Sequence, residues 1–142
     1  METNAVLNKI AAIERCIKRV KEEYEDNPES LKNFTKQDSI ILNLQRACQT
    51  AIDLGSYVYS KKKLGLPQDA KDTFIALGEN NLISIEVAEK MGKMVGFRNT
   101  AIHEYQGINL NIVQSIIEVN LVDFDEFSKG ILQLINPNSE EF

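Results

Sequence analysis

Residues 96–105 hold the side chains of this sequence that are best suited to chemistry. Within eight positions they bring together an arginine, an amide, a histidine, a carboxylate and a phenol: Arg98, Asn99, His103, Glu104 and Tyr105. His103 is the only histidine among the 142 residues. A guanidinium is always charged and can hold two phosphate oxygens at once, and an imidazole can accept or donate a proton near neutral pH. We therefore expect any catalysis to take place in this stretch.

Arg98 and His103 supply the minimum for cleaving RNA without a metal ion. A base must take the proton of the 2′-hydroxyl, an acid must protonate the leaving oxygen, and a cation must stabilise the charged phosphorane. One histidine performs only one proton transfer at a time, so a second copy of the chain could provide the other. The same groups could instead bind a nucleotide without cleaving it, or form an ordinary ion pair and a helix cap. Their spacing alone leaves these interpretations open.

Helical geometry limits how the two residues can cooperate. On one unbroken helix Arg98 and His103 would be about 140° apart, so they would not converge. Asn99 and His103 would be neighbours one turn apart, which would let Asn99 orient the imidazole. Arg98 and Tyr105 would share a face. Either the helix breaks between Arg98 and His103, or these residues meet their copies in a dimer.

Apolar stripes at helical spacing predict that the elements around this stretch are all α-helices. Residues 3–25 carry one clean stripe, formed by Val6, Ile10, Ile13, Ile17, Val20 and Tyr24. Residues 40–59 are apolar on more than one face, which is typical of a central helix, and Ala47, Ala51 and Gly55 leave room for another helix. No alternating strand pattern is present. We predict one domain, residues 1–142, built as an antiparallel up-and-down bundle of five or six helices with a frayed acidic tail over residues 137–142.

Capping residues suggest where the later helices begin. Thr35 and Asp38 have the spacing of a capping box at the start of the second helix. Asp69 is expected to cap a short third helix, and a fourth is expected from Leu82 to about residue 97. Asn109 is expected to cap the next helix, with Ile112 facing inward, and residues 121–135 form the last helix.

Charge and hydropathy restrict the partners. The net charge is −5, and residues 109–142 carry all of it, with six acids and one base. This acidity argues against broad nonspecific binding of nucleic acid but allows a local basic patch, for which Lys90 and Lys93 are the candidates beside the motif. No apolar run approaches the roughly 20 residues of a membrane span, and the N-terminus does not look like a signal peptide. We expect a cytoplasmic protein.

The run Arg98-Asn99-Thr100-Ala101-Ile102-His103 resembles the R-x4-6-H motif of the HEPN superfamily, including the polar residue after the arginine. His103-Glu104-Tyr105 extends it to R-x4-H-x-Y, which looks like the HepT-like branch of HEPN toxins. The order of the expected helices is also similar, so the resemblance covers roughly residues 5–135.

The resemblance implies a metal-independent endoribonuclease toxin that uses no cofactor and forms a homodimer. In such dimers two R-x4-H motifs line a shared cleft, so Arg98 and His103 would be catalytic and Asn99 supporting. The implied partner is an MNT nucleotidyltransferase antitoxin that transfers AMP from ATP to a tyrosine, here Tyr105. A noncatalytic nucleotide-binding or docking subunit of a nucleotidyltransferase complex is the alternative. A purely structural dimerisation bundle, in which Gly92 and Gly96 serve packing, is the third interpretation.

Overall fold

The computed structural model describes residues 1–135, so the tail predicted to be frayed lies outside the described residues. The elements in chain order are α1 (Thr3–Tyr24), the 3₁₀ turn η1 (Pro28–Lys32), α2 (Phe34–Lys61), α3 (Ala70–Glu79), α4 (Ile85–His103), the 3₁₀ turn η2 (Tyr105–Gly107), α5 (Leu110–Ser115), the π-helical turn η3 (Ile116–Asn120) and α6 (Leu121–Ile135). No strand occurs in residues 1–135. The predicted all-α fold is therefore confirmed, with α5 and α6 joined through η3.

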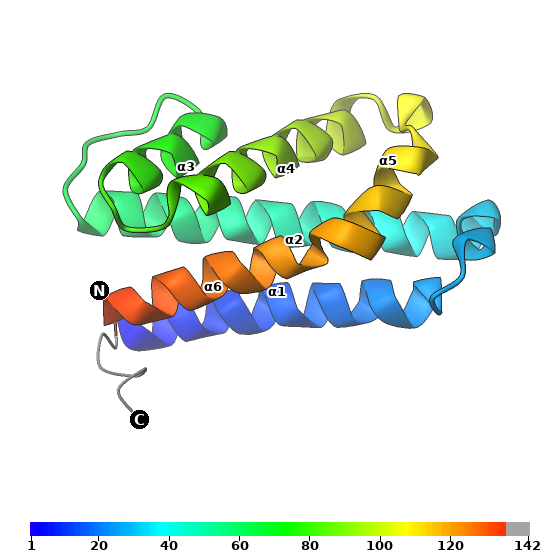
Figure 1. Cartoon of the computed structure of the whole chain (residues 1–142), viewed down its shortest axis with the longest axis horizontal. Helices are drawn as coiled ribbons and strands as arrows, with labels where there is room; N and C mark the ends of the chain where they lie inside the picture. The colour runs from blue at the N-terminus through cyan, green and yellow to red at the C-terminus, as the bar shows by residue number, and fades with distance from the viewer. Residues whose placement is uncertain (136–142) are drawn as a thin grey trace.

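The helices form an antiparallel bundle that runs up and down along one axis (Figure 1). α1 and α2 lie side by side over their length, and α4 runs antiparallel to α2. α6 then returns across α1 and α4 and ends beside the start of α1, while α3 packs against α2 and α4. α4, the helix that carries the motif, is thus held between α2 on one side and α6 on another.

The packing of α1 follows directly from its sequence. All six residues of the predicted stripe are buried, and Val6 and Val20 are fully inaccessible to solvent. Because the stripe repeats every three or four residues, it stays on the side of α1 that faces α2 and α6. The charged residues of α1 lie outside this stripe, and Arg15 and Arg19 among them border the groove toward α2.

A close approach of α3 to α2 also matches the sequence. A Cβ added at Gly55 would lie 3.3 Å from Thr73 Cγ2 and 3.4 Å from Phe74 Cε1, so glycine is what lets α3 pack this tightly. Asp69 caps α3 as expected, because its side chain accepts a hydrogen bond of 2.8 Å from the backbone N–H of Asp72.

Three local predictions are wrong. Asn33, not Thr35, caps α2, accepting a hydrogen bond of 3.1 Å from the backbone N–H of Lys36. α4 begins after Ser84, whose hydroxyl caps it, rather than at Leu82, and it continues to His103 rather than ending at about residue 97. Ile112 is 53% exposed instead of inward-facing, since the short α5 packs through Val113. None of the helices within residues 1–135 is long and apolar enough to cross a membrane.

Candidate active site

α4 continues without a break through Arg98 to His103. It ends there because Glu104 leaves the helical conformation, while its backbone N–H still donates to the Thr100 carbonyl at 2.8 Å. The alternative of a break between Arg98 and His103 is thereby excluded. On this continuous helix the two residues are about 7.5 Å apart along the axis and about 140° apart around it. Within one chain their side chains leave α4 in different directions.

Arg98 is held by a neutral partner. Its Nη1 donates a hydrogen bond of 2.7 Å to Oε1 of Gln49 on α2, and its buried Nε has no hydrogen-bond partner. Among residues 1–135 no carboxylate forms an ion pair with Arg98. The neighbouring Cys48 thiol has its pKa raised to about 12 by burial, against the opposing effect of the Arg98 charge. An ordinary structural ion pair therefore does not explain Arg98, and its positive charge is not neutralised within the described chain.

His103 and Asn99 are exposed on the last turns of α4. Their separation of four residues puts them on adjacent turns of one face. No hydrogen bond joins them in the part of the chain that the structure describes, so the orienting role of Asn99 stays a prediction. The exposure of His103 leaves its imidazole accessible to a large substrate or to a second copy of the chain.

Tyr105 lies in η2, directly after α4, and reaches back to α2. Its hydroxyl donates a hydrogen bond to the carboxylate of Asp38. Burial, followed by this hydrogen bond and the negative charge of Asp38, raises the pKa of Tyr105 to about 12. The ring remains 36% exposed. The hydroxyl is therefore protonated at neutral pH, fixed in place and still reachable.

Asp38 is a site residue that sequence reasoning missed. Its spacing from Thr35 suggested a capping role, and nothing local pointed to Tyr105, which is 67 positions away. The antiparallel packing of α2 and α4 brings the two together. The same packing brings Gln49 to Arg98, so both of these contacts come from α2.

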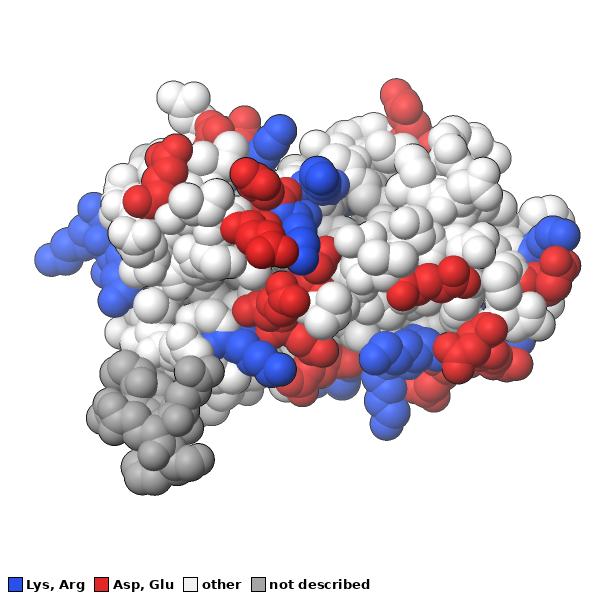
Figure 2. Space-filling view, viewed as in Figure 1, with Lys and Arg blue, Asp and Glu red and all other residues white. Residues whose placement is uncertain are grey.

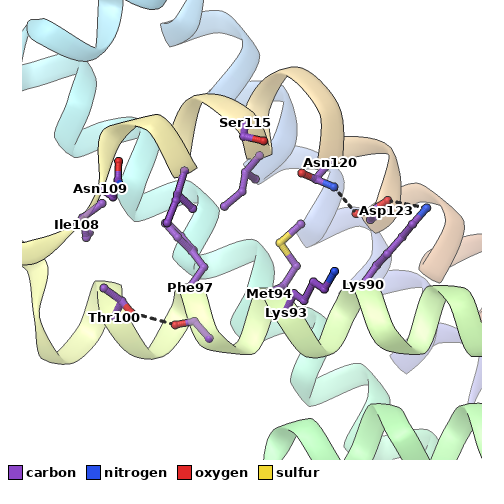
Figure 3. A pocket seen from close by; sticks show the side chains of 13 residues that line it. Lys90, Lys93, Met94, Phe97, Thr100, Ile108, Asn109, Ser115, Asn120 and Asp123 are labelled. Carbon is purple, nitrogen blue, oxygen red and sulfur yellow. Dashed lines mark hydrogen bonds and ion pairs between the residues drawn. The ribbon is translucent and has the colours of Figure 1, made fainter.

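The two candidate lysines are in different electrostatic surroundings. The ammonium of Lys90 is within ion-pair distance of three carboxylates: Glu86 at 3.1 Å, Asp123 at 3.6 Å and Glu126 at 3.9 Å. Its charge is thus offset, as Figure 3 shows for Asp123. Lys93 is exposed one turn further along α4. Acidic and basic side chains gather near the middle of this face, whereas the surface over α5 and the C-terminal part of α4 is largely uncharged (Figure 2).

A cavity of about 590 Å³ between α4 and α5 contains none of the predicted catalytic residues (Figure 3). Its walls include Lys93, Met94, Phe97 and Ile116. Arg98 faces α2, on the other side of α4. This cavity is therefore separate from the candidate active site. Within residues 1–135 no group of three or more His, Cys, Asp and Glu side chains is placed to hold a metal ion.

The chain is similar in sequence to known proteins. The sequence pattern of the family described as "Ribonuclease HepT-like" matches residues 13–131. The chain belongs to the Ribonuclease HepT-like family. It is 45% identical over 122 residues to the "mRNA nuclease HepT" of Shewanella oneidensis, covering 86% of this chain and 92% of that protein. It is 30% identical over 111 residues to the "tRNA nuclease HepT" of Aphanizomenon flos-aquae, covering 78% of this chain and 76% of that protein.

A solved structure extends the similarity to three dimensions. It is the tri-AMPylated Shewanella oneidensis HEPN toxin in complex with MNT antitoxin, with a TM-score of 0.87 and 43% sequence identity. The match covers 93% of this chain and 98% of that one. The HEPN-like bundle expected from the motif is thus confirmed as the fold of this HepT-like chain.

Proposed function

We propose that this HepT-like chain is the toxin of a toxin–antitoxin pair and acts as a metal-independent endoribonuclease. The observation that carries the proposal is the environment of Arg98, which bonds to the neutral amide of Gln49 and forms no ion pair with an acid in residues 1–135. A free guanidinium charge is what a cleaved phosphate needs, since negative charge builds up on its oxygens. Two relatives of this chain carry the name of RNA nucleases, which supports RNA as the substrate.

In the proposed mechanism the active site is completed by a second copy of the chain. Arg98 holds the scissile phosphate and His103 moves protons. Because the two side chains diverge on a continuous α4, one protomer is poorly arranged to bring both groups to one phosphate, and its single histidine performs one proton transfer at a time. A homodimer that joins two copies of the C-terminal part of α4 provides a second histidine, and Asn99 lies beside His103 to orient it. Of the two candidate RNA contacts, Lys93 forms no ion pair in residues 1–135, whereas Lys90 is already engaged by acids.

The proposed partner is an MNT nucleotidyltransferase that silences the toxin by AMP transfer to Tyr105. A HEPN toxin of 43% identity to this chain is known in tri-AMPylated form with an MNT antitoxin. Tyr105 is two residues beyond His103, is partly exposed and has its hydroxyl fixed by Asp38. An AMP group there would put bulk and negative charge next to the histidine, which would obstruct RNA and repel its phosphates.

The nuclease function is tested with purified protein, single-stranded RNA and EDTA. We expect endonucleolytic cleavage that survives the chelator and falls by at least about 10²-fold in Arg98→Ala and in His103→Ala. Circular dichroism and sedimentation must show that the variants keep their fold and association state. RNA or nucleotide binding without cleavage by the wild type would instead favour the noncatalytic docking subunit.

The shared site is tested with heterodimers. Wild-type and His103→Ala chains with different affinity tags are co-expressed, and the mixed dimer is purified through both tags. If each site needs a histidine from both protomers, the mixed dimer has activity far below half of the wild-type value. Half of the wild-type activity would mean that each protomer works alone, and a wild type that sediments as a monomer would also exclude the shared site.

A further inference from the structure

A second pocket, distinct from the cavity between α4 and α5, lies in the groove between α1 and α2. Its volume is about 550 Å³. Its charged lining consists of three arginines, Arg15 and Arg19 from α1 and Arg46 from α2. The remaining lining is small or polar and comprises Ala12, Cys16, Asn43, Gln49 and Thr50. No acid and no lysine contribute to it, in a chain whose net charge is −5.

The arginines of this chain are concentrated in and beside this pocket. The sequence holds four arginines, and the fourth is Arg98. Arg98 donates its hydrogen bond to Gln49, which also lines the pocket. All four guanidinium groups are therefore in the pocket or one side chain away from it, whereas the twelve lysines of the chain lie elsewhere. Arginine differs from lysine in the planar fork of donors that matches two oxygens of a phosphate.

The arginines of the pocket are largely without acidic partners. Arg15 and Arg46 form no ion pair in residues 1–135, and Arg19 forms only a long one, 3.9 Å from Glu23. Arg46 and Arg15 both lie close enough to the Cys16 thiol to lower its pKa, although burial is the larger effect and leaves it raised. Arg15 and Arg19 of α1 and Arg46 of α2 are exposed and line the same pocket, so their guanidinium groups border one groove. An anion bound in the groove would offset the repulsion between these charges.

We propose that the pocket formed by Arg15, Arg19 and Arg46 binds the sugar–phosphate backbone of the RNA substrate, next to the phosphate held by Arg98. A positively charged groove that follows the backbone is how proteins bind single-stranded nucleic acid without reading its sequence. Gln49 lines the pocket and also contacts Arg98, so it lies between the two proposed phosphate positions. The pocket explains how an acidic protein binds RNA, because its positive charge is local. This inference rests on the proposed ribonuclease function and adds the place where the substrate is held.

The test uses the full chain with His103→Ala, so that RNA is bound but not cleaved. The affinity for a fluorescent single-stranded RNA oligonucleotide is measured by anisotropy between 50 and 200 mM salt. In the variant with Arg15→Gln and Arg46→Gln we expect binding at least about tenfold weaker. The salt slope should fall by about 1.4, at about 0.7 for each lost phosphate contact. The charge-matched control, Lys18→Gln with Lys21→Gln on the same helix, should bind almost as the parent does.

A second measurement separates binding from chemistry. In chains that keep His103, the double arginine variant should raise KM about tenfold and leave kcat near the wild-type value. Arg15→Lys with Arg46→Lys should restore part of the affinity, because the charge returns without the fork.

Each outcome decides a different point. If Arg15→Gln with Arg46→Gln has the same RNA affinity and salt slope as the control Lys18→Gln with Lys21→Gln, the proposal that this pocket binds RNA is wrong. The proposed nuclease function would be unaffected by that result. Dissociation of the dimer in the arginine variant would overturn the pocket proposal too, and would assign these arginines to contact between copies. Arginine-dependent RNA binding by a wild-type chain that never cleaves RNA would support the pocket and refute the nuclease. A chain that neither binds nor cleaves RNA would refute both.

Discussion

Replacing Gln49 by glutamate tests whether the free charge of Arg98 is what the site uses. Gln49 Oε1 accepts the Arg98 Nη1 hydrogen bond at 2.7 Å, so Gln49→Glu puts a carboxylate oxygen at the same place with almost no change in shape. Two opposite unit charges about 4 Å apart attract by about 4 kcal/mol at an effective dielectric constant of 20. An attraction of that size would offset much of the electrostatic attraction between Arg98 and a phosphate at a similar distance.

We expect kcat for RNA cleavage to fall by about 10²-fold in Gln49→Glu, the size seen when one donor to a developing anion is lost. Stability should change by less than about 1 kcal/mol. The stronger charge-assisted bond to Arg98 is gained, while the 2.9 Å bond from Gln49 Nε2 to Asp53 is replaced by repulsion one turn away on α2. Cleavage of a fluorescent RNA and urea unfolding measure the two quantities on the same preparation.

Two further variants separate charge from geometry. Gln49→Met removes the hydrogen bond without adding charge, so it should cost about 1 kcal/mol of stability but much less activity than Gln49→Glu. Gln45→Glu adds the same charge one turn earlier on α2, where Gln45 forms no hydrogen bond with Arg98, and should change the activity little. Equal losses of activity in Gln49→Met and Gln49→Glu, or full activity in Gln49→Glu, would refute the reasoning.

Three further predictions concern the tyrosine switch and the packing of glycines. Co-expression with an MNT nucleotidyltransferase should add one or more AMP masses to the chain, and none in Tyr105→Phe, by intact-mass spectrometry. In ultraviolet titration Tyr105 should ionise near pH 12. The pKa of Tyr105 in the folded chain lies above its ordinary value of 10.0. The contribution of Tyr105 to the free energy of unfolding is therefore complete below about pH 10 and is lost as the pH rises toward 12. Asp38→Asn should lower the midpoint of the Tyr105 titration. Gly78→Ala should destabilise the fold by about 1–3 kcal/mol, since the new Cβ would lie 2.8 Å from Ala88 Cβ. At Gly96 a new Cβ would meet nothing within 4 Å, so Gly96→Ala should stabilise the fold by up to about 1 kcal/mol. Urea unfolding measures both changes.

The parts of the fold that depend on local repetition were predictable from the sequence. The α1 stripe repeats over six positions, so a single burial direction satisfies all of them. Gly55 and the residues one and two turns before it marked a close helix contact, which α3 fills. Asp69 marked the start of α3 because a cap acts through the next three residues only.

The contacts that define the site depend on packing between distant segments. Gln49 and Arg98 are 49 positions apart, and Asp38 and Tyr105 are 67 apart. Each partner has an ordinary local interpretation, as with Asp38 in a capping box, so no local pattern identifies the pair. The same holds for the arginines of the pocket, because Arg15 and Arg19 come from α1 and Arg46 comes from α2. Motif spacing singled out the candidate residues but not the groups that contact them.

The surroundings of Arg98 are a poor arrangement for stability, and that is the strongest physical sign of its use. A buried donor without a partner costs about 1–3 kcal/mol, and Nε of Arg98 is such a donor. A carboxylate on α2 would bond the guanidinium more strongly than the amide of Gln49 does. A chain under selection for stability alone would gain from an acid within reach of Arg98 and away from Asp53. An arginine that must attract a phosphate cannot have one, because the acid would neutralise the charge on which binding depends.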